Sequence, residues 1–539
     1  MDPKITEPDP PSYRNGMSQV LRYGEFTTTG NRKVRYAVSL TEWDLTIQKI
    51  TSTPAIRSKM VLNLRDCVGS RAFRADDNTD TGAYFSAFFY PFKKRWMNSG
   101  VARQRVEQCF RVDLVKDPRA NLEEAEKWAR AIRECSALQQ HPRNGILYSE
   151  VRRPCRAMLL VNPHSGKGQA LSLFTRHVQH MLNEAGVSHT LVITERPNHA
   201  RELVREADLS QWDALVIISG DGLLFEVVNG LMEREDWERA IQTPLGILPG
   251  GSGNAMAASI HHYSGAQPVS SEELLVSCGF LLCKGLVSHM DLASVHLGSA
   301  SSSPTRVFSF LSVAWGFVAD VDVESERYRH IGAARFTLGT LVRLASLRVY
   351  QGRLAFLPAD NAGRVDGRPL CSLVVPCQNN FHNSCNSNNA SRARKHEPVP
   401  ADAPLKGPPD SLLVPLDQPV PSNWVVVPED NFILVLAVYQ SHLGEDFYTA
   451  PESTLNDGII HLLYVRAGIS RIALLQLFLA MGKGTHLANN CPHLVYVQVR
   501  ALRLEPSSPK GLITVDGEVV EYGPVQAQVH SGLARLISR

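Results

Sequence analysis

Long hydrophobic runs, paired cysteines and a strong charge of one sign are all missing from this 539-residue sequence. The longest apolar stretch, around residues 307–319, is shorter than the roughly 20 residues that a bilayer-spanning helix needs. Residues 1–13 carry no apolar signal-peptide core, and the ten cysteines form no Cys-x-x-Cys pair. A net charge of +3 excludes a strong overall field for nucleic acid. We therefore expect a soluble intracellular protein with reduced thiols, whose contact with membranes is peripheral.

The chain is too long for a single hydrophobic core, so we expect several domains. Alternating strand and helix patterns are typical of a parallel sheet, whereas successive strand runs favour a β-rich domain. The expected parts are a disordered tail at 1–20, a β-rich domain at 21–140, an α/β lobe at 153–290, a β-rich lobe formed by 291–357 and 422–539, and a disordered insertion at 358–421 rich in proline, asparagine and serine.

The first β-rich domain ends in one predicted helix, at residues 122–135 with Asn121 as its N-cap. Its apolar face carries Trp128, which we expect to be buried. Strands followed by such a helix resemble the pleckstrin-homology fold. A basic run, Lys93-Lys94-Arg95, favours an anionic membrane, nuclear-import or chromatin partner for this domain, with a solvated hairpin as the alternative. The expected locations are the cytoplasm, with peripheral membrane association, and the nucleus.

Three glycine-rich loops each follow a strand-like run of the α/β region, at residues 162–168, 219–222 and 249–254. Ligands bind at the carboxyl ends of strands in open α/β sheets, and glycine lets a backbone approach phosphate closely. The first loop lacks the Walker A spacing. Asp221 lies between two glycines of the second loop, where a carboxylate can serve acid–base or metal chemistry. A turn-capping role is the alternative for Asp221.

With further segments, these loops resemble the diacylglycerol-kinase-type lipid kinases, and more closely the sphingosine kinases. The segments are Thr194–Val204, Ser219–Leu223, Gly251–Ala255, Ala314–Asp322, Arg335–Thr340 and Val515–Glu518. The N-terminal extension, the proline-rich insertion and the stretch Glu521–His530 are most similar to type 2 members of that family. The resemblance implies a two-lobed lipid kinase, with a Rossmann-like α/β nucleotide lobe and an antiparallel β-sandwich lipid lobe behind the pleckstrin-homology-like domain.

The resemblance also implies ATP and Mg²⁺ as cofactors. Asp221 matches the general base that accepts the proton of the lipid hydroxyl, and whether it also holds Mg²⁺ is left open. Glu226 is assigned either to support of the loop or to Mg²⁺. The residues that match nucleotide contacts are Asn162, Pro163, His164, Thr194, Glu195, Arg196, Pro197, Asn198, Ser219, Gly222, Glu226, Gly251, Ser252, Gly253, Arg329, Arg335, Asp516, Gly517 and Glu518.

By the same resemblance, Asp322 matches the carboxylate that holds the ammonium group of sphingosine, although its acidic surroundings also suit a solvated loop. The other residues that match substrate contacts are Ser312, Thr340, Phe317, Phe336 and His461. The implied function is ATP-dependent phosphorylation of the primary hydroxyl of sphingosine or dihydrosphingosine to sphingosine 1-phosphate. Two alternatives are another lipid kinase, for ceramide or diacylglycerol, and a non-catalytic membrane or chromatin adaptor.

Overall fold

The computed structural model describes residues 19–29, 31–50, 59–75, 80–95, 100–139, 155–298, 305–327, 334–359, 364–365, 368–369 and 406–538. The chain divides into two compact units, residues 1–148 and 149–539. Within the described ranges, no helix combines the length and the apolar character that crossing a membrane requires.

The first unit is built on an antiparallel sheet of seven strands in the order β4-β3-β2-β1-β9-β6-β5. In β3 buried and partly exposed side chains alternate, as expected for a strand with one face on the core, whereas β6 is buried throughout. The strands are β1 (Arg22–Thr28), β2 (Asn31–Leu40), β3 (Asp44–Lys49), β4 (Lys59–Asn63), β5 (Cys67–Arg74), β6 (Ala83–Phe89) and β9 (Val106–Val112), with a separate hairpin of β7 (Phe92–Lys94) and β8 (Val101–Arg103) and a short 3₁₀ helix, Leu64–Asp66.

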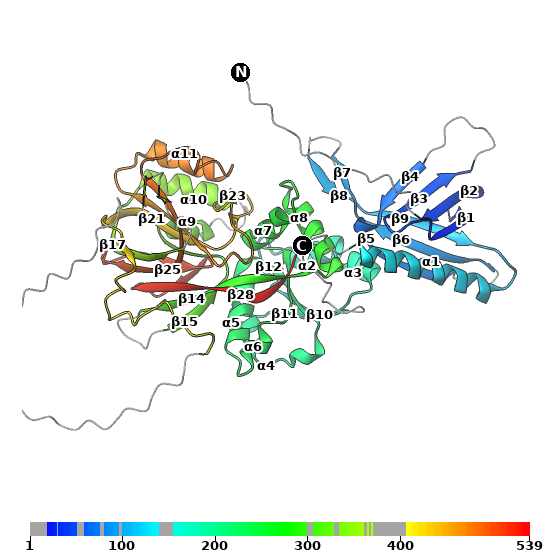
Figure 1. Ribbon diagram of the computed structural model, residues 1–539, viewed down its shortest axis with the longest axis horizontal. Helices are drawn as coiled ribbons and strands as arrows, with labels where there is room; N and C mark the ends of the chain where they lie inside the picture. The colour runs from blue at the N-terminus through cyan, green and yellow to red at the C-terminus, as the bar shows by residue number, and fades with distance from the viewer. Residues whose placement is uncertain are drawn as a thin grey trace, which may run out of the picture. The chain divides into compact units, whose positions relative to one another are not determined.

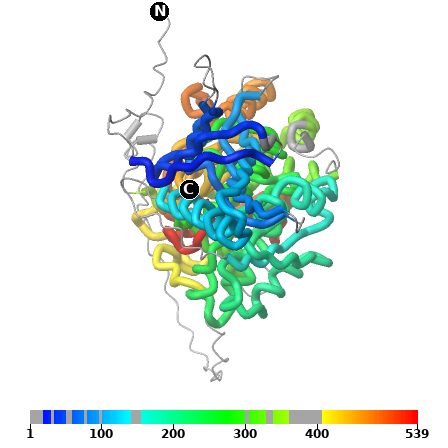
Figure 2. Tube along the Cα trace, turned by 90° about the vertical axis from the view of Figure 1, so that its right-hand side faces the viewer, coloured from blue at the N-terminus to red at the C-terminus, as the bar shows by residue number. Residues whose placement is uncertain are grey.

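A single long helix, α1 (Pro118–Leu138), packs on β5 and β6 of this sheet (Figures 1 and 2). Trp128 is 2% exposed, as expected, and its ring stacks on Phe85 at 5.5 Å. The predicted N-cap was wrong, because Asp117 caps the helix by accepting a hydrogen bond from the Arg119 N–H. Asn121 is instead buried inside the helix, where its side chain accepts from the Leu114 N–H and donates to the Thr81 carbonyl.

The second unit begins with parallel strands in the order β11-β10-β12-β13, as the alternating pattern predicted. β10 and β12 are almost wholly buried, because helices cover both faces of such a sheet. The strands are β10 (Arg156–Val161), β11 (Ser188–Ile193), β12 (Ala214–Ser219) and β13 (Leu245–Pro249); the helices are α2 (Ala170–His177), α3 (Gln179–Ala185), α4 (His199–Glu206), α5 (Asp221–Met232), α6 (Trp237–Ala240), α7 (Ala255–Tyr263) and α8 (Ser271–Lys284), with a 3₁₀ turn at Leu209–Gln211.

The remaining strands pair antiparallel around a large apolar core that includes Trp315. They are β14 (Val287–Leu297), β15 (Thr305–Ser309), β16 (Ser312–Gly316), β17 (Tyr350–Pro358), β20 (Val425–Val426), β21 (Asn431–Val438), β24 (Ile460–Arg466), β25 (Leu494–Pro506), β26 (Ile513–Val515), β27 (Glu518–Val520) and β28 (Val525–Ile537). Two small pairs are β18 (Arg364–Val365) with β19 (Arg368–Pro369) and β22 (His442–Gly444) with β23 (Phe447–Tyr448), and three helices are α9 (Phe317–Ser325), α10 (Ala334–Ala345) and α11 (Arg471–Met481).

One strand joins the two halves of the second unit into a continuous sheet of 15 strands. β28 pairs in parallel with β13 at Leu536 and Leu245, and antiparallel with β14 and β25 (Figure 1, red). The α/β and β-rich lobes expected from the sequence are therefore not separated by a flexible linker, because they share backbone hydrogen bonds along one sheet.

Part of the expected disordered insertion is ordered. Residues 370–405 lie outside the described residues, but residues 406–424, which we call the strap, cross the β-rich sheet. The buried Arg503 guanidinium donates to the carbonyls of Gln418, Val414 and Pro415 at 2.6, 2.9 and 3.1 Å. Composition predicted disorder here, but Trp424 is buried in a cluster against which Leu412 and Val420 pack. These apolar contacts and the hydrogen bonds to the sheet together order the strap.

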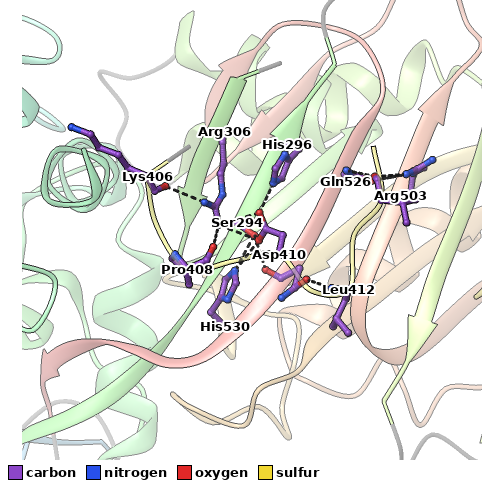
Figure 3. Close-up of polar contacts among 12 residues, drawn as sticks. Ser294, His296, Arg306, Lys406, Pro408, Asp410, Leu412, Arg503, Gln526 and His530 are labelled. Atoms are coloured by element: carbon purple, nitrogen blue, oxygen red, sulfur yellow. Dashed lines mark hydrogen bonds and ion pairs between the residues drawn. The ribbon is translucent and has the colours of Figure 1, made fainter. Parts of the chain in front are cut away.

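A second anchor of the strap is Asp410, which four side chains of the sheet surround (Figure 3). It accepts hydrogen bonds from Arg306 at 3.1 Å, contacts His296 at 2.6 Å and His530 at 3.1 Å, and also accepts from Ser294. Burial acts to raise the pKa of Asp410, but the hydrogen bonds from His296, His530 and Ser294 outweigh it and hold the pKa well below its usual range. The carboxylate is thus ionised and fully engaged in the fold.

Replacing Asp410 with asparagine is expected to lower the free energy of unfolding by about 2–3 kcal/mol, because the Arg306 guanidinium would stay buried without its charge partner. Asp417→Asn, an exposed carboxylate of the same strap, is the matched control and should change stability by less than about 0.5 kcal/mol. Urea unfolding of the full chain measures both. Equal losses in the two variants would contradict the anchoring role.

Candidate active site

The three glycine loops meet at the carboxyl ends of β10, β12 and β13 and form one side of a cavity of about 760 Å³. The second and third loops touch backbone to backbone. A Cβ on Gly220 would lie 2.5 Å from the Gly253 carbonyl oxygen, and one on Gly251 would lie 2.4 Å from the Gly220 Cα. Larger residues would therefore push the loops apart, which explains the glycines at both positions. The first loop is held to the second by a hydrogen bond of 2.9 Å from Ser219 to Ser165.

Asp221 is the first residue of α5, and its carboxylate faces the start of a different helix, α7. The N–H groups of Ala255 and Met256 donate to its two oxygens at 2.7 and 3.1 Å. Desolvation raises the pKa of Asp221 to about 7, with repulsion from Asp516 and Glu445 adding to it, although the two backbone hydrogen bonds oppose the rise. A carboxyl group in this state can both accept and release a proton near neutral pH.

Asp516 brings the β26–β27 turn to the same cavity. It has a left-handed φ of 52°, and its carboxylate accepts hydrogen bonds from the N–H groups of Phe310, Leu311 and Ser312 and from the Ser309 hydroxyl. Desolvation raises the pKa of Asp516 to about 6 against these hydrogen bonds. The neighbouring Glu518 lies above the start of α5, since a Cβ on Gly222 would fall 2.6 Å from its Oε1.

The opposite side of the cavity is apolar and comes from α9, α10, α11 and the β22–β23 hairpin. Phe317 on α9 stacks on Phe478 on α11 at 5.3 Å, and Phe447 of the hairpin lies 5.8 Å from Phe478. The apolar residues in this wall are Leu311, Ala314, Phe317, Val318, Val321, Leu341, Leu443, Phe447, Leu475, Phe478 and Leu479. The cavity therefore joins a phosphate-type glycine site to a chamber suited to a hydrocarbon chain.

The three carboxylates of the acidic segment 320–324 lie on α9 and have different partners. Asp320 is buried against Arg343 and Tyr350, and Glu324 pairs with Arg343 at 3.2 Å. Asp322 alone of the three lines the cavity, next to Gly517. The segment 320–324, for which a solvated loop around Asp322 was the alternative, is instead part of helix α9, and Asp320 in it is 2% exposed.

Most of the residues proposed from the sequence lie in the wall of this one cavity. These are Asn162, His164, Thr194, Glu195, Arg196, Pro197, Ser219, Asp221, Gly222, Glu226, Gly251, Ser252, Gly253, Ser312, Phe317, Asp322, Thr340, Asp516, Gly517 and Glu518. Glu226 accepts a hydrogen bond from the Ala200 N–H at 3.1 Å, which fits the loop-supporting alternative. Arg196 is paired with Glu202 through two hydrogen bonds.

The structure does not bring every proposed residue to the site. Pro163 and Asn198 lie outside the cavity lining, and Asn198 takes a left-handed φ of 63° before α4. His461 is buried in β24, where it contacts the Tyr496 hydroxyl at 2.7 Å, and it does not line the cavity. Arg329 lies outside the described residues, as do the side chains of Arg335 and Phe336.

The sequence missed the β22–β23 hairpin and most of the apolar wall. The run Ile472–Met481 predicted a helix but gave no sign of which face meets a ligand, and nothing in the sequence singled out Glu445. The cavity lining is strongly acidic. Besides the basic Arg196 it contains the acidic residues Glu195, Asp221, Glu226, Asp322, Glu326, Glu445, Asp446, Asp516 and Glu518. Among the described residues, no three His, Cys, Asp or Glu side chains are grouped closely enough to hold a metal ion by themselves.

Two family models match the second unit. The diacylglycerol kinase catalytic domain matches residues 156–295, and the YegS C-terminal NAD kinase beta sandwich-like domain matches residues 427–538. A solved diacylglycerol kinase from Bacillus anthracis covers 71% of this chain and 97% of its own, with 15% identity and a TM-score of 0.40. That score is low, so the family models and not this likeness support the fold.

Two human proteins are similar over much longer stretches. Sphingosine kinase 2 of Homo sapiens is 39% identical over 622 residues, covering 99% of this chain and 93% of its own. Sphingosine kinase 1 of Homo sapiens is 53% identical over 386 residues, covering 72% of this chain and 91% of its own. The type 2 likeness expected from the sequence thus extends over both units, while the type 1 likeness is stronger over a shorter part. With these relatives and a lipid-kinase catalytic domain around Asp221, the chain belongs to the sphingosine kinase family of diacylglycerol-kinase-type lipid kinases.

Proposed function

We propose that this protein transfers the γ-phosphoryl group of ATP to the primary hydroxyl of sphingosine and dihydrosphingosine, with Asp221 as the general base. One observation carries the proposal: Asp221 lies in a single cavity whose two sides suit the two substrates, glycine loops for a nucleotide and an apolar wall for a lipid chain. The two human relatives are named as sphingosine kinases, which supports the choice of lipid.

In the proposed reaction, the lipid oxygen attacks the γ-phosphorus while its proton moves to the Asp221 carboxylate, and ADP leaves. The N–H groups of Ala255 and Met256 fix the direction of that carboxylate. Most of the remaining rate enhancement comes from alignment of the two substrates and from stabilisation of charge. We propose that the backbone of the glycine loops holds the phosphates and that Asp322 holds the substrate ammonium through an ion pair.

Mg²⁺ fits the donor set of this cavity, because hard cations take carboxylate oxygens and usually rely on only one or two of them together with nucleotide phosphates. Asp221 and Glu518 are the carboxylates we propose to hold it, since Glu518 lies above the start of α5. When bound, Mg²⁺ supplies charge neutralisation at the phosphates.

For the first unit, we propose a pleckstrin-homology-like module that contacts anionic membranes or nuclear partners. Its antiparallel sheet followed by one C-terminal helix supports this assignment, as do the exposed side chains of Lys93 and Lys94 on β7. We also propose a cytoplasmic protein that associates with membranes and can enter the nucleus.

A kinase assay with γ-labelled ATP and sphingosine, ceramide or diacylglycerol tests the activity and the substrate together. We expect label in sphingosine and dihydrosphingosine, and little in the two lipids that lack an ammonium group. Preferential labelling of ceramide or diacylglycerol would contradict the substrate assignment. No transfer to any lipid would contradict the kinase proposal and favour an adaptor.

The pH dependence of kcat/KM gives a second prediction. The Asp221 base must be ionised in the free enzyme, and its pKa is about 7. We therefore expect kcat/KM to fall about tenfold for each pH unit below that value and to level off above it. Rates at saturating ATP across about pH 5.5–8.5 measure the acid limb. If kcat/KM falls only at the ordinary pKa of a carboxyl group, the base is not desolvated.

A further inference from the structure

The turn of the β22–β23 hairpin reaches across the cavity to the nucleotide side. Glu445 in this turn accepts a hydrogen bond from the Asn254 side-chain amide at 2.5 Å and another from the Ser271 hydroxyl at 2.6 Å. Asn254 directly precedes α7, and Ser271 begins α8. One side chain from the lipid side is therefore bonded to two helix starts on the nucleotide side.

Asn254 connects Glu445 to the third glycine loop. Its amide oxygen accepts from the Gly251 N–H and its amide nitrogen donates to the Gly251 carbonyl, each at 3.0 Å. The next two residues, Ala255 and Met256, are those whose N–H groups hold Asp221. A connected series of hydrogen bonds and one peptide segment thus leads from Glu445 to the Asp221 carboxylate.

Further contacts keep the hairpin against α7. The His442 N–H donates to the Ser259 hydroxyl at 3.1 Å, and the Tyr448 hydroxyl contacts His262 Nε2 at 3.0 Å. The hairpin also supplies Leu443 and Phe447 to the apolar wall. Because both strands of the hairpin bond to α7, the position of Glu445 beside the start of that helix is fixed.

We propose that Glu445 is a positioning residue for the kinase reaction: through Asn254 it holds the start of α7 against the Asp221 carboxylate. This inference rests on the proposed function. Three other carboxylates share the same surroundings, Asp516 and Glu518 from the β26–β27 turn and Glu226 one helical turn along α5. Glu445 differs from them because it alone of the four bonds to Asn254.

Glu445→Gln tests the proposal with two measurements on the full chain. Amide hydrogen exchange should become faster in residues 251–258, because glutamine replaces two charge-assisted hydrogen bonds with weaker neutral ones. The kcat should fall about three- to tenfold while the KM of each substrate changes less than about twofold, because a shifted α7 start misdirects the Asp221 carboxylate without removing a substrate contact. Ser271→Ala removes one of the two donors to Glu445 and should give the same changes to a smaller extent.

Glu452→Gln is the matched control, since it removes an exposed carboxylate just after the hairpin and outside the cavity lining. It should change neither measurement. The proposal is overturned if Glu445→Gln behaves like this control in exchange or in kcat, for example by lowering the melting temperature alone. A parent protein that phosphorylates no lipid would contradict the proposed function; hydrogen exchange needs no substrate and would still decide whether Glu445 holds the start of α7.

Discussion

Replacing Asp221 with asparagine is expected to lower kcat by about 10²–10⁴-fold, the range that loss of a general base produces. Asparagine has nearly the same shape, and its oxygen can still accept from the N–H of Ala255 or Met256. It cannot take a proton from the lipid hydroxyl, so the substrates should bind but react slowly. Initial rates with labelled ATP and sphingosine, together with the KM of each substrate, measure the effect.

Asp291→Asn is the control for this variant. Asp291 is also a buried carboxylate that accepts from two backbone N–H groups, those of Gly458 and Gly532 at 2.6 and 2.7 Å, and desolvation raises its pKa to about 6. It does not line the cavity. We therefore expect Asp291→Asn to alter stability but to keep the kcat of the folded protein. If Asp221→Asn keeps more than about a tenth of the parental kcat, Asp221 is not the base.

Asp322→Asn should reduce kcat/KM for sphingosine by about 30- to 5,000-fold, because removing one partner of a desolvated ion pair costs about 2–5 kcal/mol. The KM for ATP should change little, since Asp322 lies on α9 at the apolar side of the cavity. The loss is expected to be much smaller for a long-chain alcohol without an amine. Steady-state rates with the two acceptors give the comparison.

The same helix provides the control. The side chain of Glu324 is 35% exposed, pairs with Arg343 and lies outside the cavity lining. Glu324→Gln should therefore leave the preference between the two acceptors unchanged. Equal losses for the amine and the alcohol in Asp322→Asn would mean that Asp322 shapes the cavity instead of recognising the ammonium group.

Local pattern was sufficient to predict the α/β half. The run Ala214–Ile218 is apolar throughout and is followed by the glycine loop 219–222, so both the strand and its loop could be predicted. The structure places β12 at Ala214–Ser219. The predicted helix at 171–185 is instead two helices, because Val178 is both the C-cap of α2 and the N-cap of α3.

Partners far apart in the sequence were not predictable. No strand was predicted at residues 525–537, which form β28. Local sequence also cannot tell whether β13, β14 or β25 lies beside such a strand, because any strand edge offers the same hydrogen-bonding groups. The strap shows a similar limit, since its order depends on Arg306 and Arg503 elsewhere in the chain. Glu445 acquires its place only through Asn254 and Ser271, which lie far away in sequence.

The position of β28 between β13 and β25 also has a consequence for how the protein is made. The ribosome releases Leu245 of β13 long before Leu536 of β28, yet the two residues pair in the finished sheet. Until then β13 presents an unpaired edge, which attracts other strands and can start aggregation. The nucleotide side of the nascent chain therefore stays incomplete until β28 has been synthesised, and the β13 edge is open to wrong strand pairing during that interval.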